Sequence, residues 1–81
     1  MLKGNEYKET VNLDNKFQLD MLLHYNETEW EINYFFEPMK QDVVVAGTIT
    51  DGKLAITTDS CGYCESMLPV FQTLYENARK A

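Results

Sequence analysis

Basic side chains are scarce in this sequence. Seven lysines and arginines stand against thirteen aspartates and glutamates, which gives a formal net charge of -6. Proteins that grip nucleic acid by its phosphates need clustered Lys and Arg, whereas here only Arg79 and Lys80 are adjacent. The composition therefore argues against direct nucleic-acid binding and permits a protein partner with a basic surface.

Long hydrophobic runs are missing as well. No apolar stretch approaches the roughly 18 residues needed to cross a bilayer, and the first residues lack the hydrophobic region of a secretory signal. We therefore expect no membrane segment and a cytoplasmic location. Hydrophobic residues make up 44% of the chain and charged residues 25%, which is typical of one globular domain. We expect that domain to span residues 1–81, with residues 1–6 flexible.

Glycine, histidine and cysteine are too few for several common kinds of site. The four glycines are dispersed, so no glycine-rich phosphate loop is present. The single histidine, His24, has no Ser or Asp at the spacing of a hydrolase triad, and we interpret it as an exposed surface residue. A structural zinc site needs four ligands, and two cysteines and one histidine supply three. A carboxylate or a second copy would have to complete the set, so we predict no metal and no cofactor.

The hydrophobic pattern predicts strands followed by one helix. Apolar and polar residues alternate with the period of half-buried strands, and Asp51-Gly52 is a strong signal for a tight hairpin turn. Residues 17–25 are also rich in helix formers, so a helix is the alternative there. The predicted strands are residues 7–13, 17–25, 29–36, 42–50 and 53–59.

Two of these strands and the helix define the expected core. Residues 43–46 are apolar on both sides, which predicts a central strand covered on both faces. Residues 66–81 show helical spacing of apolar side chains, with Gln72, Glu76 and Arg79 on the outward side. In the strand of residues 29–36, one face is expected to pack against this helix: Trp30, Ile32, Tyr34 and Phe36.

The expected fold class is α+β. A single amphipathic helix after a run of strands can bury the apolar face of a sheet by packing across it. Short connections favour pairing of each strand with its predecessor. We therefore predict an antiparallel β-meander of four to five strands with one C-terminal helix packed on one face.

The second face of residues 27–35 carries the predicted binding site. Alternate residues of a strand project from one face about 6.6 Å apart, and they form a row of carboxylates that ends in a polar and an apolar side chain. Such a row can compete for a basic groove on a partner, while an ordinary solvated face is the alternative. The residues of this acidic row are Glu27, Glu29, Glu31, Asn33 and Phe35.

From this row we predict a small non-catalytic protein-binding module. An inhibitor or regulator of a larger, nucleic-acid-binding protein is the kind of function that an acidic row serves. Pairing of two copies through an edge strand, giving a homodimer, is a further possibility.

One sharp chemical motif remains, Cys61-Gly62-Tyr63-Cys64. Two cysteines at this spacing before a helix can form a redox pair, because the helix N-terminus stabilises a thiolate. The stretch from Cys61 to Pro69 resembles the active-site segment of the thioredoxin superfamily, where a proline commonly follows five residues after the second cysteine. The resemblance implies a thiol–disulfide redox protein or redox sensor, with Cys61 attacking and Cys64 resolving. It covers nine residues, and the strand-rich chain before it departs from that family's order.

A simpler interpretation of the same stretch places Ser66 at the helix start. Pro69 then lies in the first turn, where a missing N–H has no helical partner to lose. We expect this later start and an ordinary thiol at Cys61.

Overall fold

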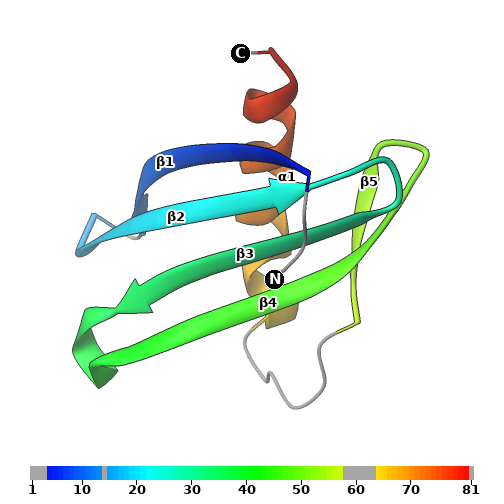
Figure 1. The fold of residues 1–81 in the computed structure, drawn as a ribbon. Helices are drawn as coiled ribbons and strands as arrows, with labels where there is room; N and C mark the ends of the chain where they lie inside the picture. The colour runs from blue at the N-terminus through cyan, green and yellow to red at the C-terminus, as the bar shows by residue number, and fades with distance from the viewer. Residues whose placement is uncertain (1–3, 14, 58–63, 81) are drawn as a thin grey trace.

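A computed structural model describes residues 4–13, 15–57 and 64–80 of the chain. They form a five-stranded sheet and one helix, α1, which lies across one face of the sheet (Figure 1). The strands follow one another in the order β1-β2-β3-β4-β5, each antiparallel to its predecessor, so the predicted α+β meander is confirmed. The elements are β1 (Asn5–Leu13), β2 (Phe17–Tyr25), β3 (Glu29–Phe36), the 3-10 turn η1 (Glu37–Met39), β4 (Gln41–Thr50), β5 (Lys53–Ile56) and α1 (Cys64–Lys80).

The ambiguous segment 17–25 is a strand. β2 pairs with β1 along its whole length, from Tyr25 opposite Asn5 to Phe17 opposite Leu13. Leu19, Met21 and Leu23 are buried on the helix side. Pairing on both edges and burial of alternate side chains outweigh the helix propensity of these residues, which is a weak preference. β1 begins at Asn5, two residues before the predicted start.

The core lies between α1 and the predicted inner face of β3. Trp30, Ile32 and Tyr34 are buried there. The ring of Phe71 on α1 lies 5.7 Å from that of Trp30 and 6.5 Å from that of Tyr34. The fourth predicted member, Phe36, is half-buried at the end of the strand, and its ring meets Phe17 at 5.9 Å.

The expectation that residues 43–46 are covered on both faces is wrong. Val45 is fully buried beneath α1, but Val44 is 51% exposed on the opposite face. The helix covers one face of the sheet and leaves the other uncovered. The run of valines in β4 therefore reflects the preference of β-branched side chains for strands and not burial on both faces. Hydrophobic surface is therefore exposed on the side of the sheet away from α1.

The sequence predicted the turn after β4 correctly but placed the start of α1 too late. Asp51 and Gly52 have φ values of 53° and 77°, the left-handed pair that a two-residue hairpin turn requires, so the predicted turn is confirmed. The helix begins at Cys64, two residues before the expected start, and Pro69 lies inside it beyond the first turn. The proposed first-turn position of Pro69 is therefore wrong, and its missing N–H removes one helical hydrogen bond.

Gln72 joins α1 to the edge strand β5. The sequence places it on the outward side of the helix, but it is half-buried and faces the sheet. Its Oε1 accepts a hydrogen bond from the backbone N–H of Leu54 at 2.9 Å, and its Nε2 donates to the backbone oxygen of Gly52 at 3.0 Å. The side chain thereby satisfies backbone groups of an edge strand that would otherwise need water.

We expect Gln72→Leu to lower the free energy of unfolding by about 1–3 kcal/mol, because it leaves these backbone groups without their partner. Urea denaturation of the variant measures this directly. The adjacent Thr73→Ala is the control, because Thr73 is exposed and its hydroxyl donates to the oxygen of Pro69 within the same helix. Equal stabilities of the two variants would show that the Gln72 contacts contribute nothing.

No helix in the described ranges is both long enough and apolar enough to span a membrane.

Candidate functional site

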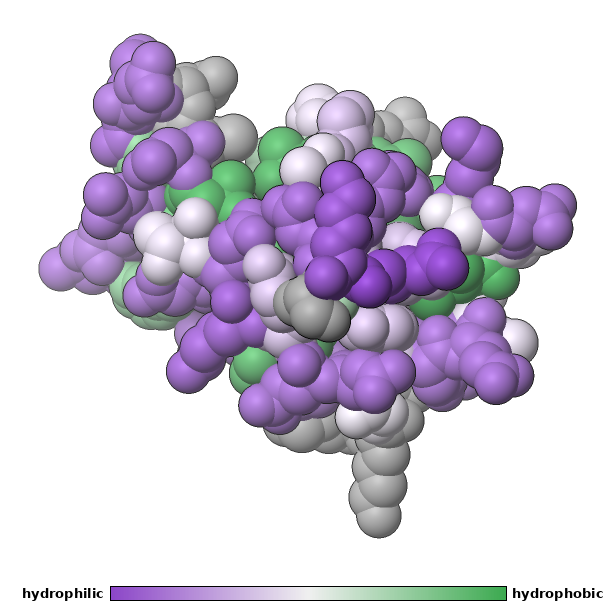
Figure 2. Space-filling view, turned by 90° about the horizontal axis from the view of Figure 1, so that it is seen from above, coloured by the Kyte–Doolittle hydropathy of each residue, from purple (hydrophilic) through white to green (hydrophobic). Residues whose placement is uncertain are grey.

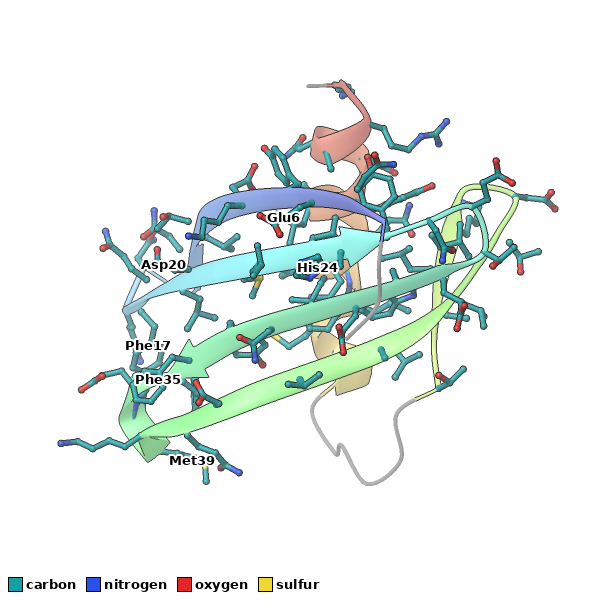
Figure 3. The ribbon with its side chains drawn as sticks, viewed as in Figure 1. Glu6, Phe17, Asp20, His24, Phe35 and Met39 are labelled. Carbon is teal, nitrogen blue, oxygen red and sulfur yellow. The ribbon has the colours of Figure 1, made fainter. Side chains whose placement is uncertain are left out.

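The side of the sheet turned away from α1 is called the outer face here. Along β3, Glu31 and every second residue on either side of it project from this face. The residues that pair with them on β2 and β4, and through β2 on β1, project from the same face. Figure 3 labels four residues of this face, Glu6, Asp20, His24 and Phe35. Its members include Glu6, Lys8, Thr10, Asp20, Leu22, His24, Glu29, Glu31, Asn33, Phe35, Asp42, Val44, Ala46 and Thr48.

Four of the five residues of the predicted row lie together on this face. Glu29, Glu31, Asn33 and Phe35 alternate along β3 with the buried inner residues. Glu27 does not join them, because it precedes the strand and lies in the turn from β2. The amide oxygen of Asn26 forms this turn by accepting the backbone N–H groups of Thr28 at 2.9 Å and Glu29 at 2.8 Å. This turn, made by the Asn26 side chain, precedes β3, so the strand alternation does not extend back to Glu27 as the sequence pattern predicted.

His24 is the residue that sequence reasoning misjudged most. It lies on the outer face, as its alternation indicated, but it is 8% exposed rather than a free surface side chain. Its cross-strand neighbours are Glu6 on β1 and Glu31 on β3. Nε2 of His24 and Oε2 of Glu6 are 2.9 Å apart (Figure 3), and the imidazole donates because an ionised carboxylate only accepts.

This arrangement separates the carboxylates of β1 and β3 by the imidazole of β2. Like charges placed opposite one another across a sheet destabilise it. The ring of His24 stands between Glu6 and Glu31 in the cross-strand row. It supplies a hydrogen-bond donor between groups that repel each other. The acidic surface is thus built into the sheet by a specific polar contact.

Exposed hydrophobic side chains gather at the opposite end of the outer face, beside the carboxylate of Asp42. Phe35 is 45% exposed, Val44 51% and Met39 65%; these three residues are called the apolar patch. Phe35 pairs with Asp42, and Val44 pairs with Asn33, so Phe35 and Val44 are diagonal neighbours within reach of each other. Met39 follows in η1, at the same end of the sheet (Figure 3).

Hydrogen bonds to backbone oxygens fix β3, η1 and β4 around this patch. Nδ2 of Asn33 donates to the backbone oxygen of Val43 at 3.1 Å, from β3 to β4. Lys40 closes η1 in the left-handed conformation, with its N–H donating to the oxygen of Glu37 at 3.0 Å. The amide of Asn33, predicted as a polar contact, is therefore engaged within the sheet, and the side chains of Phe35 and Val44 beside it are exposed.

A separate polar cluster ties β1 to the helix on the inner side. The hydroxyl of Tyr7 donates to Oε1 of Glu9 at 2.7 Å, and Nδ2 of Asn77 donates to the same oxygen at 3.2 Å. The bond to Glu9 raises the pKa of Tyr7 above its ordinary value of 10.0, since the phenolate could not donate to the carboxylate. Glu9 is therefore a structural acceptor, distinct from the carboxylates of the outer face.

The cysteine motif falls outside what the structure describes. Cys61 lies in the segment 58–63, and of Cys64 only its backbone, as the first residue of α1, is described. The redox roles assigned to the two cysteines stay a prediction. Among residues 4–57 other than 14, and in α1, no three or more His, Cys, Asp or Glu side chains form a group suited to a metal ion.

No protein-family model, curated protein or solved structure matches the chain. The surface offers the remaining evidence. Seen from above, hydrophilic residues predominate and hydrophobic ones show only as small separate areas (Figure 2). The three large exposed hydrophobic side chains of the described residues are those of the apolar patch. The outer face is therefore the main candidate for a functional surface.

Proposed function

We propose that this protein is a non-catalytic binding module whose outer face docks onto a basic surface of another protein. The observation that carries the proposal is the pairing of exposed carboxylates with an exposed apolar patch on one sheet face. Protein interfaces combine apolar contact area with charged groups that steer and orient the partner. Each of these two elements has its own support.

The apolar patch favours binding over simple solvation. One face of an antiparallel sheet can stand in water, but a solvated face is usually polar. Here Phe35, near the end of β3, and its diagonal neighbour Val44 on β4 are each about half exposed, and Met39 is exposed in the turn that joins the two strands. Adjacent exposed hydrophobic side chains rimmed by polar ones mark interaction sites. Covering them by a partner removes apolar area from water, which is favourable.

The charge of the face favours a basic partner. Lys53 of β5 also lies on this face, because it pairs with Thr50 of β4. Lys8 and Lys53 are outnumbered by carboxylates spread over β1 to β4. Complementary charge raises the rate of encounter and disfavours acidic competitors. An inhibitor or regulator that occupies the basic groove of a nucleic-acid-binding protein is the kind of function supported by such a face. The carboxylates concerned are Glu6, Asp20, Glu29, Glu31 and Asp42.

The test compares charge removal on and off this face. We expect Glu29→Gln/Glu31→Gln to fold normally and to bind the partner about 3- to 10-fold more weakly at low ionic strength, because two interface charges of modest strength are lost. The loss should shrink as salt rises, since salt screens exposed charges. The partner is first recovered by cross-linking to the wild-type protein in cells, then purified, and its affinity for each variant is measured by calorimetry.

A matched control separates the face from net charge. Glu76 is exposed on α1, and Glu76→Gln removes one carboxylate just as Glu29→Gln does. Glu29→Gln should weaken binding, while Glu76→Gln should leave it unchanged. Affinity that is the same for all variants at low salt would show that the acidic row is only a solvated surface.

A further inference from the structure

A hollow of about 510 Å³ lies at the end of the molecule where two hairpin turns meet the last turns of α1. The turn from β2 to β3 contributes Asn26 and Glu27, and the turn from β4 to β5 contributes Asp51. Tyr25, Tyr75 and Arg79 line the hollow between these two turns. Glu27, which the sequence assigned to the acidic row, thus lines this hollow instead.

The floor of the hollow is aromatic and already holds a cation. The rings of Tyr25 and Tyr75 meet edge to face, with centroids 5.3 Å apart and planes at 89°. The guanidinium carbon of Arg79 lies 5.6 Å from the centre of the Tyr75 ring. This is the range in which a cation is attracted by the face of an aromatic ring. Since Tyr75 is buried and Arg79 exposed, the ring is a fixed platform and the arginine a side chain free to leave it.

The charges around this platform favour a second cation. Glu27 and Asp51 are exposed carboxylates that stand on different turns. Among the described residues that line the hollow, Arg79 is the one with a cationic side chain. The end of α1 adds the partial negative charge of a helix C-terminus. An anion placed here would be repelled by two carboxylates. A cation would be attracted by both carboxylates and by the face of the Tyr75 ring.

Both carboxylates are held on turns of defined shape. Asn26 caps the start of β3 through two backbone N–H groups, as described above. Asp51 and Gly52 adopt the left-handed pair that closes the second hairpin. The backbone that carries the two carboxylates therefore needs little further ordering when a ligand arrives, which reduces the entropy cost of binding.

We propose that this hollow binds the guanidinium of an arginine side chain presented by another protein, and that Arg79 occupies the Tyr75 platform when no such arginine is present. A guanidinium fits better than an ammonium, because its planar fork stacks on an aromatic ring and bonds to carboxylates in parallel pairs. The site is separate from the outer face and does not depend on it.

The experiment is a titration of the isotope-labelled protein, followed by backbone amide chemical shifts. The probe is the peptide acetyl-Gly-Arg-Gly-amide, and the matched control is the same peptide with neutral citrulline in place of arginine. We expect saturable shifts at the amides of Asn26, Gly52 and Tyr75 with the arginine peptide and none with the citrulline peptide. Arg79→Ala should tighten binding about 2- to 5-fold, because the internal competitor is gone.

Further variants make the assignment specific. Glu27→Gln/Asp51→Asn should weaken binding about 3- to 10-fold, since each exposed ion pair contributes modestly. Glu29→Gln, on the outer face, should leave it unchanged, which separates this proposal from the one above. The proposal is overturned if Arg79→Ala binds the arginine peptide more weakly, if the citrulline peptide binds equally well, or if acetate causes the shifts instead. It is also overturned if the arginine peptide causes no saturable shifts in either the wild type or Arg79→Ala.

Discussion

Replacing Trp30 with alanine is expected to lower the free energy of unfolding by about 3–5 kcal/mol, the usual range for removing a buried large aromatic side chain. Trp30 is 1% exposed and lies against Phe71 of the helix. Its Nε1 donates to the backbone oxygens of Thr48 at 3.1 Å and Ala55 at 3.2 Å. The substitution therefore leaves a cavity and also removes the donor shared by β4 and β5.

A loss of this size approaches the whole stability expected for a small domain, which is about 0.05–0.15 kcal/mol per residue. Unfolding should be followed by circular dichroism, because Trp30 is the single tryptophan and its fluorescence disappears with it. Phe35→Ala is the matched control, since it truncates an aromatic of the same strand on the outer face, where it is 45% exposed. It should change stability by no more than about 0.5–1 kcal/mol. A Trp30→Ala variant that melts at the wild-type temperature would contradict the packing described here.

The sequence was informative wherever one local signal decided the structure. Alternation along residues 29–36 predicted that Trp30 and Ile32 face inward, and Asp51-Gly52 predicted the hairpin. Both depend on contacts between near neighbours in the chain. The order of the strands followed from short connections, which leave few alternatives to pairing in sequence.

The sequence was less informative wherever distant segments decide the outcome. The burial of His24 depends on its neighbours in β1 and β3, and the contacts of Gln72 depend on the edge of β5. Neither partner is marked by spacing along the chain. The exposure of Val44 likewise follows from the helix covering one face only, which a run of valines does not reveal.

The candidate sites divide in the same way. The row from Glu29 to Phe35 was predictable, because strand alternation alone places these side chains on one face. Glu27 was assigned to that row by extending the period of two past Asn26, although an Asn before a strand is a known turn residue and was the available signal. The hollow joins residues near 26, 51 and 75, so no pattern in the sequence could have indicated it.

The second large effect is expected at Gly47, which lies on the inner face of β4 between Trp30 of β3 and Ile56 of β5. A Cβ atom at this position would overlap the backbone oxygen of Ala55 and stand 2.8 Å from Nε1 of Trp30. Of the glycines in the described ranges, Gly52 is the one with positive φ, so Gly47 is required for space rather than for backbone conformation. Trp30 packs over the sheet because the strand beneath it carries no side chain at this point.

Gly47→Ala is therefore expected to lower the free energy of unfolding by about 1–3 kcal/mol or more, since β5 or the indole must move and a backbone atom yields little. Gly52→Ala is the informative control: its Cβ would meet nothing closer than 3.6 Å, but its φ of 77° disfavours alanine, which costs about 1–2 kcal/mol. Both variants lose stability, but only Gly47→Ala should shift the tryptophan emission and the indole N–H resonance. Trp30→Phe removes Nε1, so adding Gly47→Ala to it should cost less than adding it to the wild type. Full additivity of the two substitutions would show that the indole does not require the glycine beneath it.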